Sequence, residues 1–185
     1  MFGWTCDEEV TLYYLYMMAD GEITYSEEKI FDDICRNLQI ETVAKNTIIE
    51  KCKELINDKE DVFSIIRRDK LDEQVGKGWF FGLRDASSLA KIIWNLVNLG
   101  YADSIYSNEE KKIVQYLVDK WSISLDVYQE FIDTADAMSA LTKQKEWIAS
   151  TFSKGSIRDK KEKEVDSEIK QLLNDVKLTI QELTM

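Results

Sequence analysis

The chain has 185 residues and a formal net charge of −11, and it contains no histidine and no proline. The absence of histidine excludes Ser-His-Asp and Cys-His catalysis, zinc sites with histidine ligands and di-iron sites built on Glu-x-x-His pairs. The negative charge disfavours nucleic acid as a partner and favours cations and basic protein surfaces. A hydrophobic content of 44% supports a folded core, and without proline we expect long helices.

Three features predict a cytoplasmic, soluble protein. The three cysteines, Cys6, Cys35 and Cys52, show no Cys-x-x-Cys spacing, which indicates a reducing compartment without disulfides. The first residues lack the basic region and apolar run of a secretory signal. The longest apolar stretch, 12–19, is too short to cross a membrane, so we expect no transmembrane segment.

An internal repeat organises the first 140 residues. When the sequence is shifted by 83 residues, segment 7–56 aligns with segment 90–139 without a gap, and several identical and apolar positions coincide. The apolar positions recur at helical spacing through three successive segments. The pattern predicts an all-α fold of about seven helices in two halves related by a pseudo-two-fold axis, with an extra C-terminal helix.

Each half is expected to contain three helices. The first is apolar on nearly every side, which is typical of a central buried helix. The second and third each carry one apolar stripe and are expected to pack around the first. We expect these helices at about 8–18, 25–38 and 42–56, and at 87–99, 108–121 and from 125 onward, with a short helix and a connector, 76–82, between the halves.

The turns after the first helix of each half carry matching acidic residues. Asp20 aligns with Asp103, and Glu27 aligns with Glu110. Two interpretations are open. Thr24-x-x-Glu27 and Ser107-x-x-Glu110 are capping-box patterns, in which the glutamate caps the start of a helix. Alternatively, the four carboxylates lie near the pseudo-two-fold axis and bind Ca²⁺, Mg²⁺ or Mn²⁺, which prefer oxygen ligands.

A short motif in the first of these turns suggests a family. Ala19-Asp20-Gly21-Glu22-Ile23 followed by Ser26-Glu27-Glu28, echoed 83 residues later, resembles the TerB-like family of tellurite-resistance and stress-associated bacterial proteins. The resemblance covers about 7–140 and implies an all-α fold in two related halves. It also implies binding of a divalent metal or a partner, without an established catalytic activity. The acidic positions of the family fall on Asp20, Glu27, Asp103 and Glu110, although Ser104 and Ile105 depart from the motif in the second half.

The last part of the chain departs from the repeat. Residues 1–152 are expected to form the repeated domain, 153–163 a hinge and 164–185 an amphipathic helix. The apolar residues of this helix step by three or four, and two uses are open: packing on the domain, or binding a partner protein or a second copy of the chain. The residues predicted to bind a partner are Ile169, Leu172, Val176 and Leu183.

These patterns predict a non-enzymatic helical module of a bacterial stress-response or defence system, which binds a divalent cation at the acidic turns and docks a partner protein. A pure interaction scaffold that works through the C-terminal helix is one alternative. A Mg²⁺-dependent all-α nucleotide hydrolase is another, since Asp126, Glu130 and Asp133 share one helix face. A Glu-x-x-Glu partner motif is missing upstream, so an acidic solvated face is the simpler interpretation of these three residues.

Overall fold

The computed structural model describes residues 5–57, 61–68, 86–103 and 106–183, and every regular element within these ranges is an α-helix. The prediction of an all-α fold is confirmed. The connector expected at 76–82 lies outside the described residues. The helices are α1 (Cys6–Met17), α2 (Tyr25–Asn37), α3 (Thr42–Asn57), α4 (Val62–Arg68), α6 (Ala86–Gly100), α7 (Asn108–Lys120), α8 (Leu125–Thr151) and α9 (Ser156–Glu182).

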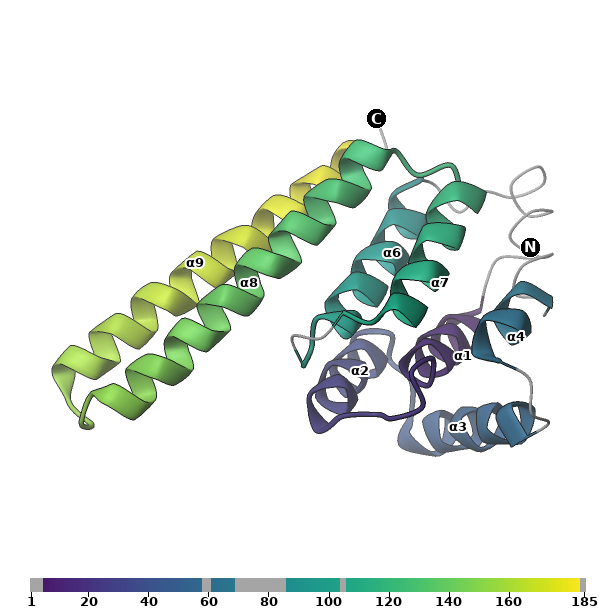
Figure 1. Ribbon diagram of the computed structural model, residues 1–185, viewed down its shortest axis with the longest axis horizontal. Coiled ribbons are helices and arrows are strands. Elements are labelled where there is room, and N and C mark those ends of the chain that lie inside the picture. The colour runs from purple at the N-terminus through teal and green to yellow at the C-terminus, as the bar shows by residue number, and fades with distance from the viewer. Residues whose placement is uncertain (1–4, 58–60, 69–85, 104–105, 184–185) are drawn as a thin grey trace.

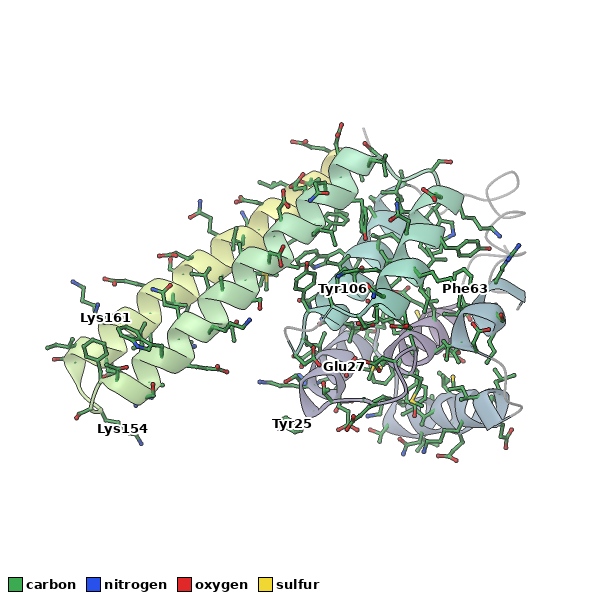
Figure 2. The ribbon with its side chains drawn as sticks, viewed as in Figure 1. Tyr25, Glu27, Phe63, Tyr106, Lys154 and Lys161 are labelled. Carbon is green, nitrogen blue, oxygen red and sulfur yellow. The ribbon has the colours of Figure 1, made fainter. Side chains whose placement is uncertain are left out.

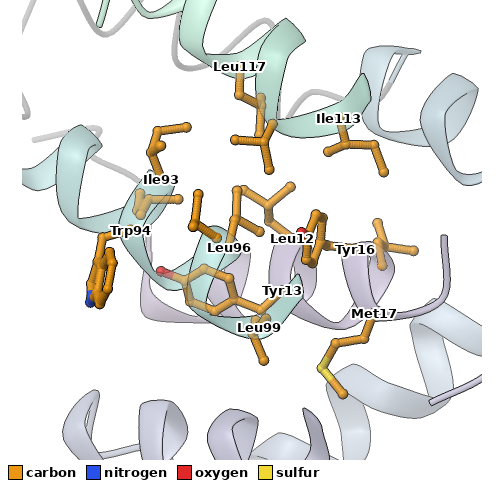
Figure 3. Close-up of a cluster of buried hydrophobic side chains, with 14 of the residues drawn as sticks. Leu12, Tyr13, Tyr16, Met17, Ile93, Trp94, Leu96, Leu99, Ile113 and Leu117 are labelled. Carbon is orange, nitrogen blue, oxygen red and sulfur yellow. The ribbon is translucent and has the colours of Figure 1, made fainter. Parts of the chain in front are cut away.

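Helices α1 and α6 form the centre of the body, and most residues of each helix are buried. They pack against one another, and both contact α2 and α7. Figure 3 shows side chains of α1, including Leu12 and Tyr16, facing Leu96 of α6 and Leu117 of α7. Helices α3 and α4 cover the remaining side of α1 (Figure 1). The C-terminal residues of α1 and α6 are therefore packed in the core.

The helix bounds follow the 83-residue register of the expected repeat. Helices α2 and α7 both have 13 residues, and their first and last residues differ by this offset. The loops that follow contain Gln39 and Ser122, also 83 apart, and these two have positive φ values of 59° and 52°. Helices α3 and α8 then begin at equivalent positions, 42 and 125. The pseudo-two-fold relation between the halves stays a prediction.

Helices α8 and α9 form a long antiparallel hairpin, called the arm below, whose free end projects away from the body (Figure 1). Each helix has 27 residues, which corresponds to about 40 Å. Helix α9 begins at Ser156, so most of the segment expected as a hinge, 153–163, is helical, and the chain reverses direction within 152–155.

The apolar stripe of α9 packs within the chain. Val176 is buried in the main core, and Ile169, Leu172 and Leu183 are half-buried. Helix α9 contacts α8 along the arm and also contacts α6 in the body. Packing on the domain is thus the use that the structure shows, while partner binding by these four residues stays a prediction. Within the described residues, none of the helices combines the length and the apolar composition that a membrane crossing requires.

Replacement of Val176 by alanine tests whether the arm is packed on the body in solution. Val176 is 1% exposed, so Val176→Ala is expected to lower the free energy of unfolding by about 2 kcal/mol in urea denaturation. The control is Leu178→Ala on the same helix, where the side chain is 50% exposed and the expected change is below about 0.5 kcal/mol. Equal, small effects of both variants would mean that α9 is detached from the core.

Candidate functional site

The turn between α1 and α2 lies close to the turn between α6 and α7. The charge of Glu27 interacts with those of Asp20 and Asp103, and the charge of Glu110 interacts with those of Glu27 and Asp20. The structure therefore brings together the four acidic residues that the sequence singled out. We call Asp20, Glu27, Asp103 and Glu110 the acidic site. Figure 2 labels Glu27 at the junction of α1 and α2, below Tyr106.

Both glutamates cap the helices in which they lie. The backbone N–H and the hydroxyl of Thr24 donate to Oε2 of Glu27 at 2.7 and 2.8 Å, and the N–H of Glu27 donates back to Oγ1 of Thr24 at 3.2 Å. In α7, the N–H of Ser107 donates to Oε2 of Glu110 at 2.9 Å, and the N–H of Glu110 donates to Oγ of Ser107 at 3.2 Å. The capping interpretation is confirmed.

Capping alone does not require these glutamates to be buried. Glu27 is 5% exposed and Glu110 is 3% exposed. A third capping box, Thr5 with Glu8 at the start of α1, makes the same hydrogen bonds at an exposed position. The pattern Thr5-x-x-Glu8 is itself a capping-box pattern, so this third capping box could have been predicted from the sequence. The difference shows that the burial of Glu27 and Glu110 follows from the packing of the two turns.

Burial raises the pKa values of both carboxyl groups. For Glu27, burial raises the pKa, the hydrogen bonds from Thr24 lower it, and the charges of Asp20 and Asp103 raise it again. For Glu110, burial is also the largest cause and the Glu27 and Asp20 charges add to it, so that the pKa rises to about 7 in spite of the hydrogen bonds from Ser107. Near neutral pH, Glu110 is thus divided between its neutral and its charged form.

Tyr16, which is buried, and Tyr106, which is half-buried, lie near Glu110. The buried hydroxyl groups of Tyr16 and Tyr106 lie close to one another, and that of Tyr106 is also close to Tyr128. Burial raises the pKa of both phenols and the charge of Glu110 raises it further, so both stay neutral. Gly100 lets them approach the end of α6, since a Cβ at this position would lie 2.4 Å from Oη of Tyr16 and 2.7 Å from Cδ2 of Tyr106. Sequence reasoning missed this pair, because the apolar run around Tyr16 indicates only a core helix.

The acidic site is not a preformed metal cage. Among the described residues, no three aspartate, glutamate, histidine or cysteine side chains converge on a point where they could hold a metal ion. Asp20 is exposed and accepts a hydrogen bond from the N–H of Glu22 at 3.2 Å, which shapes the turn around Gly21. Cation binding would therefore need a rearrangement of side chains in these turns.

The three acidic residues on α8 lie elsewhere. Asp126, Glu130 and Asp133 line a cleft of about 430 Å³ beside Leu172 of α9. The hydroxyl of Thr179 donates to Oε1 of Glu130 at 2.5 Å, and the amide of Gln129 donates to Oδ1 of Asp133 at 2.8 Å. Through these hydrogen bonds, Glu130 links α8 to α9 and Asp133 contacts a neighbouring side chain of α8.

Comparisons with known proteins do not identify a family for this chain. No family model matches this sequence, and no curated protein or solved structure matches it. The TerB-like resemblance, which rests mostly on the acidic turns, stays a prediction.

The pKa of Glu110 predicts how stability changes with pH. Its value is about 7 in the folded chain against an ordinary 4.5, so between these values the folded chain binds more protons than the unfolded chain. The stabilisation is complete below about pH 4.5 and is lost as the pH rises through 7. It amounts to something of the order of 3 kcal/mol.

Glu110→Gln tests this because glutamine keeps the capping box but does not titrate. In urea denaturation at pH 5 and pH 8, we expect wild type to lose more stability across this interval than Glu110→Gln. Glu8→Gln, in the exposed capping box, is the matched control and should follow wild type. Parallel profiles for all three proteins would contradict the raised pKa.

Proposed function

We propose that this chain is a non-enzymatic helical module that binds a divalent cation at the acidic site and docks a partner protein through the arm. One observation carries the proposal: the capping glutamates Glu27 and Glu110 are both buried, and they are close enough for their charges to interact. The TerB-like resemblance adds the setting, a bacterial stress-response or defence system. Hydrolysis of nucleotides has less support, since Thr179 and Gln129 hold Glu130 and Asp133.

Electrostatics favours a cation at the acidic site. The carboxylates of Glu27 and Glu110 are removed from water, and each is further destabilised by neighbouring negative charges. A divalent cation would relieve this repulsion and stabilise the ionised forms. The available ligands are oxygens, which suit Ca²⁺, Mg²⁺ and Mn²⁺. Asp20 is exposed and Asp103 half-buried, so the site can be reached from solvent.

Thermal unfolding with each of these ions tests the proposal. A cation at 100 times its Kd should add about 2.7 kcal/mol to the stability, which raises the Tm by roughly 5–10 °C for a chain of this size. We expect this shift at pH 8 in wild type and its loss in Glu27→Gln and in Asp20→Asn. Glutamine at position 27 preserves the capping box, so loss of the shift reports on the cation.

Glu8→Gln is again the matched control and should keep the full shift, because Glu8 caps α1 at an exposed position. A wild-type Tm that no ion changes would leave Glu27 and Glu110 as helix caps only. A shift that persists in Glu27→Gln and in Asp20→Asn would place the cation at another part of the chain.

The free end of the arm is the surface that best fits a docking role. Trp147 and Ile157 are 57% and 65% exposed there, although both are large apolar residues. Trp147 contacts Phe152 edge-on with 5.9 Å between ring centroids, and Nζ of Lys161 lies 5.4 Å from the Phe152 centroid. Figure 2 shows Lys154 and Lys161 at this end, far from the body. An exposed tryptophan is typical of protein contact surfaces, where aromatic side chains are enriched.

Photo-crosslinking in the producing cells tests the docking surface. A benzophenone amino acid in place of Trp147 is expected to give a discrete cross-linked product, which mass spectrometry would identify. The control carries the same amino acid in place of Leu178, which is also half-exposed on the arm but lies away from its free end. The same products from both positions, or none from position 147, would contradict docking through the free end.

A further inference from the structure

A groove lies where the arm meets the body. Helix α6 contacts both α2 and α9, and between these three helices is a groove of about 490 Å³. Each helix contributes residues three or four positions apart, as with Asp33 and Asn37 of α2 and Asn95 and Asn98 of α6, so each presents a single face. The volume is in the range of sites that hold a small organic molecule.

The inner surface of the groove is apolar. Ile34 of α2, Trp94 of α6 and Val176 of α9 are buried there, with exposed fractions of 7%, 8% and 1%. Leu173 and Ile180 are half-buried and continue the surface along α9. An apolar chain or ring would cover the half-buried side chains of Leu173 and Ile180, and its own apolar surface would gain the free energy of leaving water.

The charge at the rim of the groove is positive, although the chain as a whole is strongly acidic. Lys91 of α6 and Lys177 of α9 are exposed at the rim, and within the described residues neither forms an ion pair. Asp33, the carboxylate at this rim, is paired with Arg36. Two lysines without counter-ions therefore face the solvent beside an apolar surface.

Amide groups complete the rim. Asn95 is fixed by a hydrogen bond of 2.9 Å from its Nδ2 to the hydroxyl of Tyr13, which in turn donates to Oε1 of Glu9 at 2.7 Å. Asn98 lies one turn further along α6 and is half-buried. Such amides donate hydrogen bonds to carboxylate oxygens without adding charge.

We propose that this groove binds a small organic anion with an apolar body, such as a medium-chain carboxylate. The carboxylate lies at the rim between Lys91 and Lys177, and the apolar chain covers Leu173 and Ile180. Charge complementarity selects this class: the two lysines favour an anion, and the apolar inner surface disfavours a small inorganic one. The site is separate from the acidic site and does not depend on the proposed function.

Calorimetric titration with decanoate, below its micelle-forming concentration, tests the proposal. We expect saturable binding with one site per chain and movement of the side-chain amide signals of Asn95 and Asn98 in NMR spectra. The double variant Lys91→Gln with Lys177→Gln should weaken decanoate at least about tenfold, which is 1.4 kcal/mol. Both lysines are exposed, so the variant is expected to fold, and its Tm verifies this.

The matched control removes two exposed lysines outside the groove, Lys29→Gln with Lys51→Gln, and should leave the affinity unchanged. Decanol, which lacks the charge, should bind the wild type more weakly than decanoate does. The proposal is overturned if decanoate shows no saturable binding, if both double variants weaken it equally, or if decanol binds as well. Amide signals that move elsewhere would also overturn it.

Discussion

The packing of α1 against α6 fixes the position of every candidate functional group in the body. Most residues of both helices are apolar and buried, so both helices pack at the centre. The turns that follow them then lie side by side, and α2 and α7 must start there. Each of these helices is capped by a glutamate at its third position, which places one carboxylate in each turn. The proximity of Glu27 and Glu110 is thus a consequence of core packing combined with helix capping.

Much of this could be predicted from the sequence, because the signals are local. The Ser/Thr-x-x-Glu patterns gave the starts of α2 and α7, and the 83-residue repeat related the bounds of the two halves. The four members of the acidic site also followed from the repeat. The burial of Glu27 and Glu110, and hence their raised pKa values, could not be predicted, since burial depends on how the two turns meet. The approach of Tyr16 and Tyr106 to Glu110 could not be predicted for the same reason.

The arm shows a second limit of sequence patterns. A stripe of apolar residues three and four apart gives the face that is buried, but the stripe is the same whether the covering helix belongs to this chain or to a partner. In the structure, α8 continues well past the repeated segment and covers α9. At the free end of the arm, Trp147 and Ile157 stay exposed. The groove beside Lys91 and Lys177 needs three helices that are distant in sequence, so no local motif encodes it.

Capping and the proposed cation binding are compatible in one glutamate, and each would strengthen the other. A carboxylate accepts hydrogen bonds from a helix N-terminus best when it is ionised, yet burial and the neighbouring charges favour the protonated form of Glu110. A cation beside Glu27 and Glu110 would restore their ionised forms and so tighten the caps of α2 and α7 together. The same cation would draw the α1–α2 and α6–α7 turns toward one another. Cation binding at the acidic site would then affect both halves of the body together. The reason is that α2 and α7 belong to different halves and both pack against α1 and α6.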